Sequence, residues 1–161
     1  MGLIVALSVI AVWGTHLVYI LSLPPVDWMS PWTYVHMLVQ SYLYTGLFIT
    51  AHDSMHGGVS RNRRVNNAIG QISLWLFAAF RYSRMFTNHM KHHHYPGTGK
   101  DPDFSVKHQH PIPWFFEFFL TYVTVVQMLT MALLFNLLRY VFGFYTSNII
   151  AFWVLPAFLG T

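Results

Sequence analysis

The chain of 161 residues contains no cysteine. Disulfide bonds, iron–sulfur clusters and thiolate metal sites are therefore excluded within it. Imidazole and carboxylate groups remain as the strong metal ligands that the chain can offer. Such ligands suit non-haem iron, zinc, copper, manganese or haem.

Charged residues are also scarce. Only 9% of residues are charged, compared with roughly 25% in an ordinary globular domain, whereas 55% are hydrophobic. Apolar segments cover residues 3–23, 32–51, 118–138 and 149–161. A helix of about 20 residues rises about 30 Å, the thickness of a bilayer core, whereas the fourth segment is shorter than the roughly 17 residues that a span needs. We therefore predict a single all-α, multi-pass membrane domain over residues 1–161, with four transmembrane helices and with the fourth truncated at the C-terminus.

The few charges are unevenly placed. Eight of the nine Lys and Arg residues lie between Arg61 and Lys107, and the turn at residues 24–30 has Asp27 but no basic residue. The positive-inside rule then places residues 52–110 at the cytoplasmic face, with a bacterial inner membrane as the expected location. Residues 65–80 are too short for a span and should lie at the interface. The net charge of +4 thus reflects topology, and no nucleic-acid partner is expected.

Histidines are concentrated in two clusters. In each cluster the spacing is three or four residues, which places imidazoles on one face of a helix. Both clusters border the predicted cytoplasmic interface, so we expect them to converge on one metal ion or two close together. His94 is the odd member, because adjacent residues are about 100° apart on a helix. The predicted ligands are His52, His56, His89, His92 and His93.

Carboxylates near these clusters have two possible roles. Asp53, Asp101 and Asp103 could accept the second N–H of ligand imidazoles and so orient them. Alternatively, they cap helices and form turns, which is typical of Asp before Pro at residues 101–102. His94 could likewise support the ligands or face solvent.

Two further histidines, His16 and His36, fall inside the first two predicted spans. Polar residues there are functional candidates, and this pair could ligate a haem in an electron-transfer protein. The alternative is a hydrogen bond between two helices. A metal transporter is a third possibility, but it requires acidic or polar residues along the spans, and these are sparse.

Two motifs resemble a known superfamily. The first is His-Asp-Ser-Met-His-Gly at residues 52–57, and the second is His92-His93 followed by Pro-Gly-Thr at 96–98 and Asp-Pro-Asp-Phe at 101–104. With Phe-Trp-Val-Leu-Pro at 152–156, they resemble the histidine boxes and fourth span of the membrane fatty-acid desaturase/hydroxylase superfamily. Within it, the chain is most similar to the bacterial-type β-carotene ketolases.

This resemblance implies that the five predicted ligands belong to a non-haem diiron centre. It implies an oxygenase that uses O2 and a ferredoxin-like electron donor to oxidise C4 of the β-ionone ring of a carotenoid. A fatty-acyl desaturase acting on an acyl lipid, or a carotenoid hydroxylase, is the alternative within the superfamily. The family has a further HxxHH box beyond its fourth span. The chain therefore resembles a fragment, and we expect it alone to bind iron poorly and to be inactive.

Overall fold

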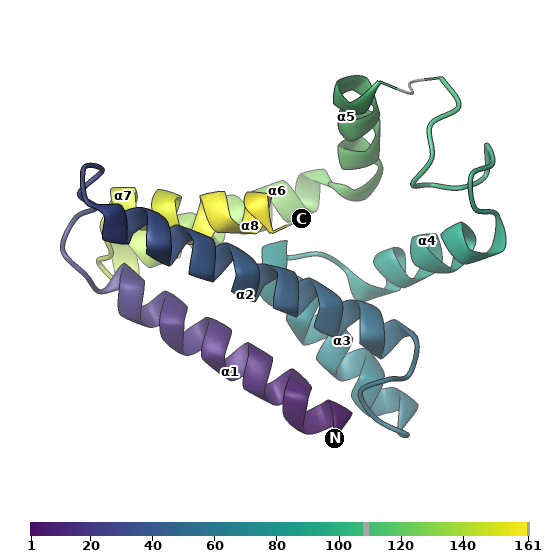
Figure 1. The fold of residues 1–161 in the computed structure, drawn as a ribbon, viewed down its shortest axis with the longest axis horizontal. Helices are drawn as coiled ribbons and strands as arrows, with labels where there is room; N and C mark the ends of the chain where they lie inside the picture. Colours follow the sequence, from purple (N-terminus) through teal and green to yellow (C-terminus); the bar gives the residue numbers. More distant parts are fainter. Residues whose placement is uncertain (108–109, 161) are drawn as a thin grey trace.

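A computed structural model describes residues 1–107 and 110–160, which contain helices but no strand (Figure 1). The predicted all-α class is therefore confirmed. Residues 108 and 109 of the predicted histidine-box segment, and Thr161 of the predicted fourth span, lie outside the described residues. The helices are α1 (Gly2–Leu21), α2 (Pro31–Met55), α3 (Arg63–Ala78), α4 (Tyr82–His94), α5 (Pro111–Tyr122), α6 (Val125–Asn136), α7 (Thr146–Ile149) and α8 (Leu155–Leu159), with π-helical turns η1 (Leu137–Val141) and η2 (Ile150–Val154).

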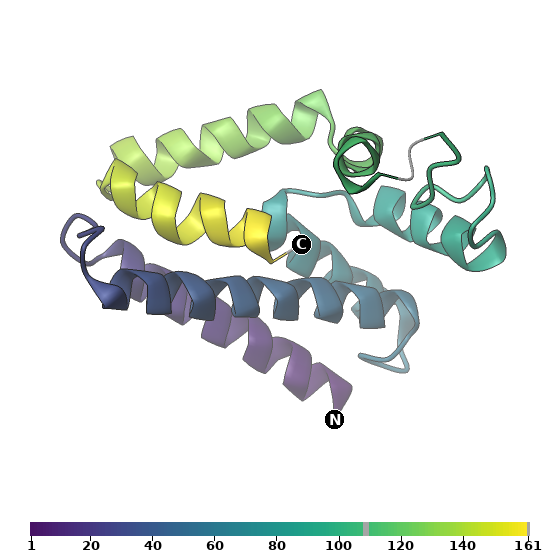
Figure 2. The same ribbon diagram turned by 45° about the horizontal axis from the view of Figure 1, so that its top comes forward.

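The N-terminal hairpin of α1 and α2 forms one side of the molecule. The segment from α7 through η2 to α8 returns along α2, with α6 beyond it (Figure 2). Their shared core contains aromatic side chains from several elements, among them Trp13 of α1, Tyr44 of α2, Phe77 of α3 and Trp153 of η2. Burial of these large rings is the main force that holds the helices together.

One helix among the described residues, α1, is long and apolar enough to cross a membrane. The bent pair of α5 with α6 and η1 adds a second candidate if it is counted as one span. Four transmembrane helices are therefore not confirmed by length and composition. Only 22% of the apolar window of α1 is buried, so most of this helix presents hydrophobic side chains outward.

The predicted span at residues 118–138 is wrong as a single helix. The chain turns by 85° between α5 and α6. Val123 and Thr124 adopt extended backbone conformations, and the Thr124 side chain accepts the N–H of Gln127 as an N-cap. The apolar run at residues 118–138 did not predict this cap, because β-branched residues such as Val123 and Thr124 occur in both helical and extended backbone. As a result, α5 stands across the other helices, near α4 (Figure 1).

Helix α3 connects the two histidine clusters along the chain. It packs against α2, and α4 then begins after Ala79, which ends α3 in the left-handed conformation with φ of 56°. Close packing depends on Gly70, because a Cβ there would lie 2.1 Å from Tyr82 Cε2 and 2.2 Å from Ser54 Oγ. The buried Tyr82 ring also belongs to one core cluster with Ala51 of α2 and Leu74 of α3, which fixes the start of α4 beside the end of α2.

Candidate metal centre

Four imidazoles from two helices converge at one point. His52 and His56 come from the C-terminal end of α2, and His89 and His93 come from successive turns of α4. One ring nitrogen from each lies within 4.8 Å of the other three. The Nε2 atom of His89 is 2.8 Å from Nε2 of His56 and 3.1 Å from Nε2 of His93. The two clusters that are 33 residues apart in sequence thus form one group of donors.

This donor set fits a metal ion. Nitrogen atoms that bind one ion at about 2.1 Å lie roughly 3 to 3.5 Å from each other, close to the separations seen here. The rings are packed with centroids 4.5 to 5.0 Å apart for His89–His93 and His56–His93, and no carboxylate is in this group. Four neutral imidazoles suit iron, zinc or copper, so the site is compatible with iron without selecting it.

Burial and neighbouring charges favour the neutral form of two imidazoles in this group. Burial, followed by the charges that neighbouring histidines would carry, lowers the pKa of His89 to about 4. Burial, together with His52 and His93, also lowers the pKa of His56, and the nearby Asp53 carboxylate opposes this effect. Because a metal binds only the neutral ring, a lowered pKa maintains the ligand form at neutral pH.

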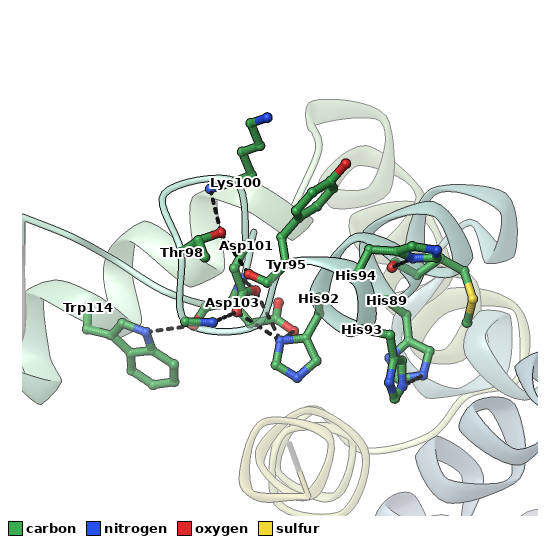
Figure 3. Close-up of polar contacts among 12 residues, drawn as sticks. His89, His92, His93, His94, Tyr95, Thr98, Lys100, Asp101, Asp103 and Trp114 are labelled. Atoms are coloured by element: carbon green, nitrogen blue, oxygen red, sulfur yellow. Dashed lines mark hydrogen bonds and ion pairs between the residues drawn. The ribbon is translucent and has the colours of Figure 1, made fainter.

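His92 lies outside this group of four. Its Nδ1 atom lies 3.0 Å from Asp101 Oδ1 and 3.6 Å from Asp103 Oδ2, in the loop that follows α4 (Figure 3). His92, Asp101 and Asp103 thus form a second group of possible metal ligands. The His92 and His93 ring centroids are 5.8 Å apart, so this second group adjoins the group of four. With Nδ1 directed at the carboxylates, Nε2 is the nitrogen of His92 that can bind a metal.

Asp101 is a buried anchor for this loop. Its carboxylate accepts the N–H groups of Gly97 at 2.8 Å and Asp103 at 2.9 Å, besides the His92 ring. Burial acts to raise the pKa of Asp101, but these hydrogen bonds outweigh it and the net pKa is lowered. Asp101 therefore both orients an imidazole and stabilises a turn, and the two roles considered from the sequence coexist.

His94 and Asp53, the two remaining candidates from the sequence, lie at the edge of the group of four histidines. His94 directs Nδ1 toward the Met90 carbonyl oxygen at 2.6 Å, and its ring points away from His89 and His93 (Figure 3). Asp53 is exposed, and its carboxylate is 3.3 Å from Nδ1 of His52. Asp53 thus contacts one member of the group, whereas the His94 ring is directed to the Met90 carbonyl instead.

The histidines that the sequence analysis placed inside the first two spans, His16 and His36, form a hydrogen bond. His16 Nε2 is 3.2 Å from His36 Nδ1, and His16 Nδ1 is 2.6 Å from Gln40 Oε1. Two axial ligands of a haem iron would lie about 4 Å apart, with the porphyrin between them. The geometry therefore favours the interhelical hydrogen bond among the two alternatives.

Sequence reasoning did not identify Tyr122 or the cavities around it. A cavity of about 70 Å3 adjoins His52 and His89, and Asp103, Phe118 and Tyr122 complete part of its wall. A larger groove of about 380 Å3, lined almost entirely by apolar side chains of α3, α5, α6 and the C-terminal helix, lies beside it. The Tyr122 hydroxyl donates to Asp103 Oδ1. Only the bend after Tyr122 brings α5 over the histidines, and the apolar run showed no sign of it.

The chain matches known proteins over most of its length. A family model described as fatty acid desaturase matches residues 27–161. A zeaxanthin 4-ketolase of Chlamydomonas reinhardtii is 39% identical over 148 residues, which cover 85% of this chain and 33% of the relative. A beta-carotene ketolase of Paracoccus sp. (strain PC1) is 39% identical over 122 residues, which cover 75% of this chain and 49% of the relative. No solved structure matches the chain.

A beta-carotene 4-ketolase of Haematococcus lacustris is 43% identical over 97 residues, which cover 59% of this chain and 30% of the relative. The chain thus spans about half or less of the length of the curated relatives it matches. The family match begins at residue 27, in the turn between α1 and α2, and extends through both histidine clusters. The resemblance drawn from the histidine motifs is confirmed, and the chain belongs to the fatty acid desaturase family.

Proposed function

We propose that this protein is an O2-dependent, non-haem diiron oxygenase that forms a ketone at C4 of a carotenoid β-ionone ring. The convergence of four imidazoles from α2 and α4 carries the proposal, because it supplies a site for the metal that such chemistry needs. Relatives named as ketolases of beta-carotene and zeaxanthin support this substrate class. β-Carotene, with an unsubstituted ring, and zeaxanthin, with a hydroxylated ring, are the candidate substrates.

Five histidines would hold the iron. His52, His56, His89 and His93 form the common group, and His92 would contribute Nε2 from the adjacent turn while Asp101 holds its Nδ1. Two ions need more donors than these five imidazoles supply. When bound, the irons would supply oxidation of a strong C–H bond by O2, a reaction that side chains alone cannot perform.

The residues of this chain would position the substrate and exclude water. The apolar groove suits a hydrocarbon polyene, because burying apolar surface there is favourable and leaves no polar group unpaired. The smaller cavity beside His52 and His89 would receive the reacting end of the molecule. The outward hydrophobic side chains of α1 would face lipid, from which such a substrate must come.

A membrane topology follows from the same arrangement. The domain would cross the bilayer with α1, α2, the bent pair α5–α6 and the segment α7–α8, while α3 and α4 lie at the cytoplasmic interface. The metal centre would then face the cytoplasm of a bacterium, where a ferredoxin-like protein would deliver electrons. The concentration of basic residues between Arg61 and Lys107 supports this orientation.

A fatty-acyl desaturase or carotenoid hydroxylase is the second candidate, because the matching family model is described as fatty acid desaturase. Product analysis separates the two. Membranes that contain the full-length protein are supplied with β-carotene, zeaxanthin or an acyl lipid, together with reduced ferredoxin and O2. Ring ketones are expected, whereas a new acyl double bond or a ring hydroxyl as the sole product would contradict the ketolase assignment.

Variants of the histidines test the metal site in the same preparation. His56→Ala and His93→Ala should each lower bound iron and ketone formation at least about tenfold, because each removes one donor of the group. His94→Ala is the matched control on α4, since its ring lies against the Met90 carbonyl and beside Tyr95 and is not part of the group of four. Iron content and turnover that survive both donor substitutions would refute this site.

A further inference from the structure

Two aromatic side chains separate the cavity at the metal centre from the apolar groove. The first space, of about 70 Å3, is lined by His52 and His89, and the second, of about 380 Å3, is lined by apolar residues of four helical segments. Among the residues described, only Phe118 and Tyr122 line both spaces. They lie one turn apart on α5 and form the wall between the groove and the histidines.

The two halves of this wall are held differently. Tyr122 is buried, with 7% of its surface exposed, and its hydroxyl donates to Asp103 in the loop that also contacts His92. Phe118 is half-buried and has no polar group, and its ring packs against Tyr122 with centroids 4.8 Å apart. Moving Phe118 breaks only apolar contacts, whereas moving Tyr122 also breaks a hydrogen bond to a carboxylate.

The size of the inner cavity makes this wall important. A space of 70 Å3 corresponds to about two water molecules and is smaller than a methyl-substituted cyclohexene ring. The groove is large enough to take part of a polyene, and a ring that passes from the groove into the inner cavity must pass Phe118 and Tyr122, which line both spaces. Phe118 is the member that can yield at lower cost.

We infer that Phe118 and Tyr122 determine which carotenoid ring ends reach the metal centre. This inference rests on the proposed ketolase function. Phe118 is the side chain that the ring displaces, and Tyr122, fixed through Asp103, limits how far the ring advances. A bulkier ring requires a larger displacement, so the wall discriminates against a ring that carries a hydroxyl. Both residues act on specificity through contact with the substrate.

A competition experiment tests this role. Membranes containing the full-length protein and reduced ferredoxin receive equal amounts of β-carotene and zeaxanthin, and the ratio of the two ketone products gives the ratio of kcat/KM values. Phe118→Ala should shift this ratio about fivefold toward zeaxanthin, within the range for a change in pocket size of a few carbons. Phe119→Ala, which shortens a neighbouring side chain of the groove only, should lower both rates alike.

The product ratio from one vessel is independent of how much variant protein folds. Tyr122→Leu provides a second variant, which removes the ring and its tether and should shift the ratio in the same direction. An unchanged ratio in Phe118→Ala, an equal shift in Phe119→Ala, or loss of all turnover in Phe118→Ala alone would overturn the inference. A wild-type protein that converts neither carotenoid would instead refute the proposed function.

Discussion

Individual polar side chains hold distant segments of this mostly apolar protein together. Asn148 is fully buried and binds the backbone of the loop that joins α1 and α2: its Oδ1 accepts the Val26 N–H at 2.9 Å, and its Nδ2 donates to the oxygens of Leu23 at 2.9 Å and Pro24 at 3.1 Å. Asp101 has the same role in the loop after α4. In both loops one buried side chain bonds several backbone groups of the loop and so fixes the conformation of the loop.

Replacing Asn148 should therefore destabilise the protein. Asn148→Ala removes the side-chain partner of three part-buried backbone groups, and we expect the free energy of unfolding to fall by about 3 kcal/mol. Thermal unfolding in detergent micelles would measure this change. Asn136→Ala is the matched control, because the exposed Asn136 donates only to Ala132 of its own helix. Equal losses in the two variants would show that the loop contacts contribute little.

His89 should make the stability of the metal-free protein depend on pH. The folded state lowers the pKa of His89 to about 4, whereas the ring in the unfolded chain titrates near 6.5. Between these values the unfolded chain binds a proton that the folded protein does not, so stability falls as the pH drops from about 6.5 to 4 and levels off below. Unfolding midpoints measured across this range in wild type and His89→Gln would test this.

The non-titrating Gln should flatten the curve. His94→Gln, which alters a histidine outside the group of four, is the control and should keep the wild-type slope. A His89→Gln variant with an unchanged slope would mean that other groups cause the pH dependence.

At the scale of helices, α3 sets the distance between the two metal-binding helices. It lies against α2 and connects directly to α4, and Gly70 is where α3, Tyr82 and Ser54 meet. A helix without a side chain at this position allows the backbone to approach, and this close approach sets where α4 can begin. The separation of His56 and His89 thus depends on a residue that binds no metal.

Gly70→Ala should consequently weaken the metal site. The added Cβ would overlap Tyr82 and Ser54, and overpacking of this kind costs about 2 kcal/mol of stability. Iron affinity, measured by titration, should fall with it, because α4 must move away from α2. Gly14→Ala is the control: nothing lies within 4 Å of its Cβ, so stability should rise by up to about 1 kcal/mol. Unaltered iron affinity in Gly70→Ala would show that α3 is not the spacer.

At the scale of the whole molecule, the turn between α1 and α2 and the candidate metal centre lie at opposite ends of α2. The turn at residues 22–30 precedes the first residue of α2, and His52 and His56 lie at its last turn. A helix of 25 residues rises about 37 Å, which exceeds the thickness of a bilayer core. If α2 crosses the membrane, these two ends face different compartments.

The lack of cysteine makes this topology simple to test. Met29→Cys in the turn at residues 22–30 and Lys100→Cys in the loop after α4 each introduce one thiol into an otherwise cysteine-free chain. Both native side chains are exposed. In intact cells a membrane-impermeant thiol reagent should label position 29 but reach position 100 only after the membrane is opened. Labelling of both positions in intact cells would contradict the proposed topology.

The amino-acid sequence by itself determined the helical class, the family and the faces on which the histidines lie. These follow from local properties: hydrophobic composition, the absence of cysteine, and the three- and four-residue spacing of ligands on a helix. The histidine pairs within α2 and α4 were predictable for this reason. Four apolar runs, in contrast, were insufficient to predict four continuous spans, because a cap at Thr124 breaks one of them.

Only the tertiary structure decided which side chains meet. It placed His89 beside His56, separated His92 from them by pairing it with Asp101, and turned α5 so that Phe118 and Tyr122 face the histidines. Each of these contacts joins segments that are distant in the chain or depends on a bend between helices. Local spacing cannot specify such contacts, since they result from how the helices pack, and packing depends on the whole set of buried side chains.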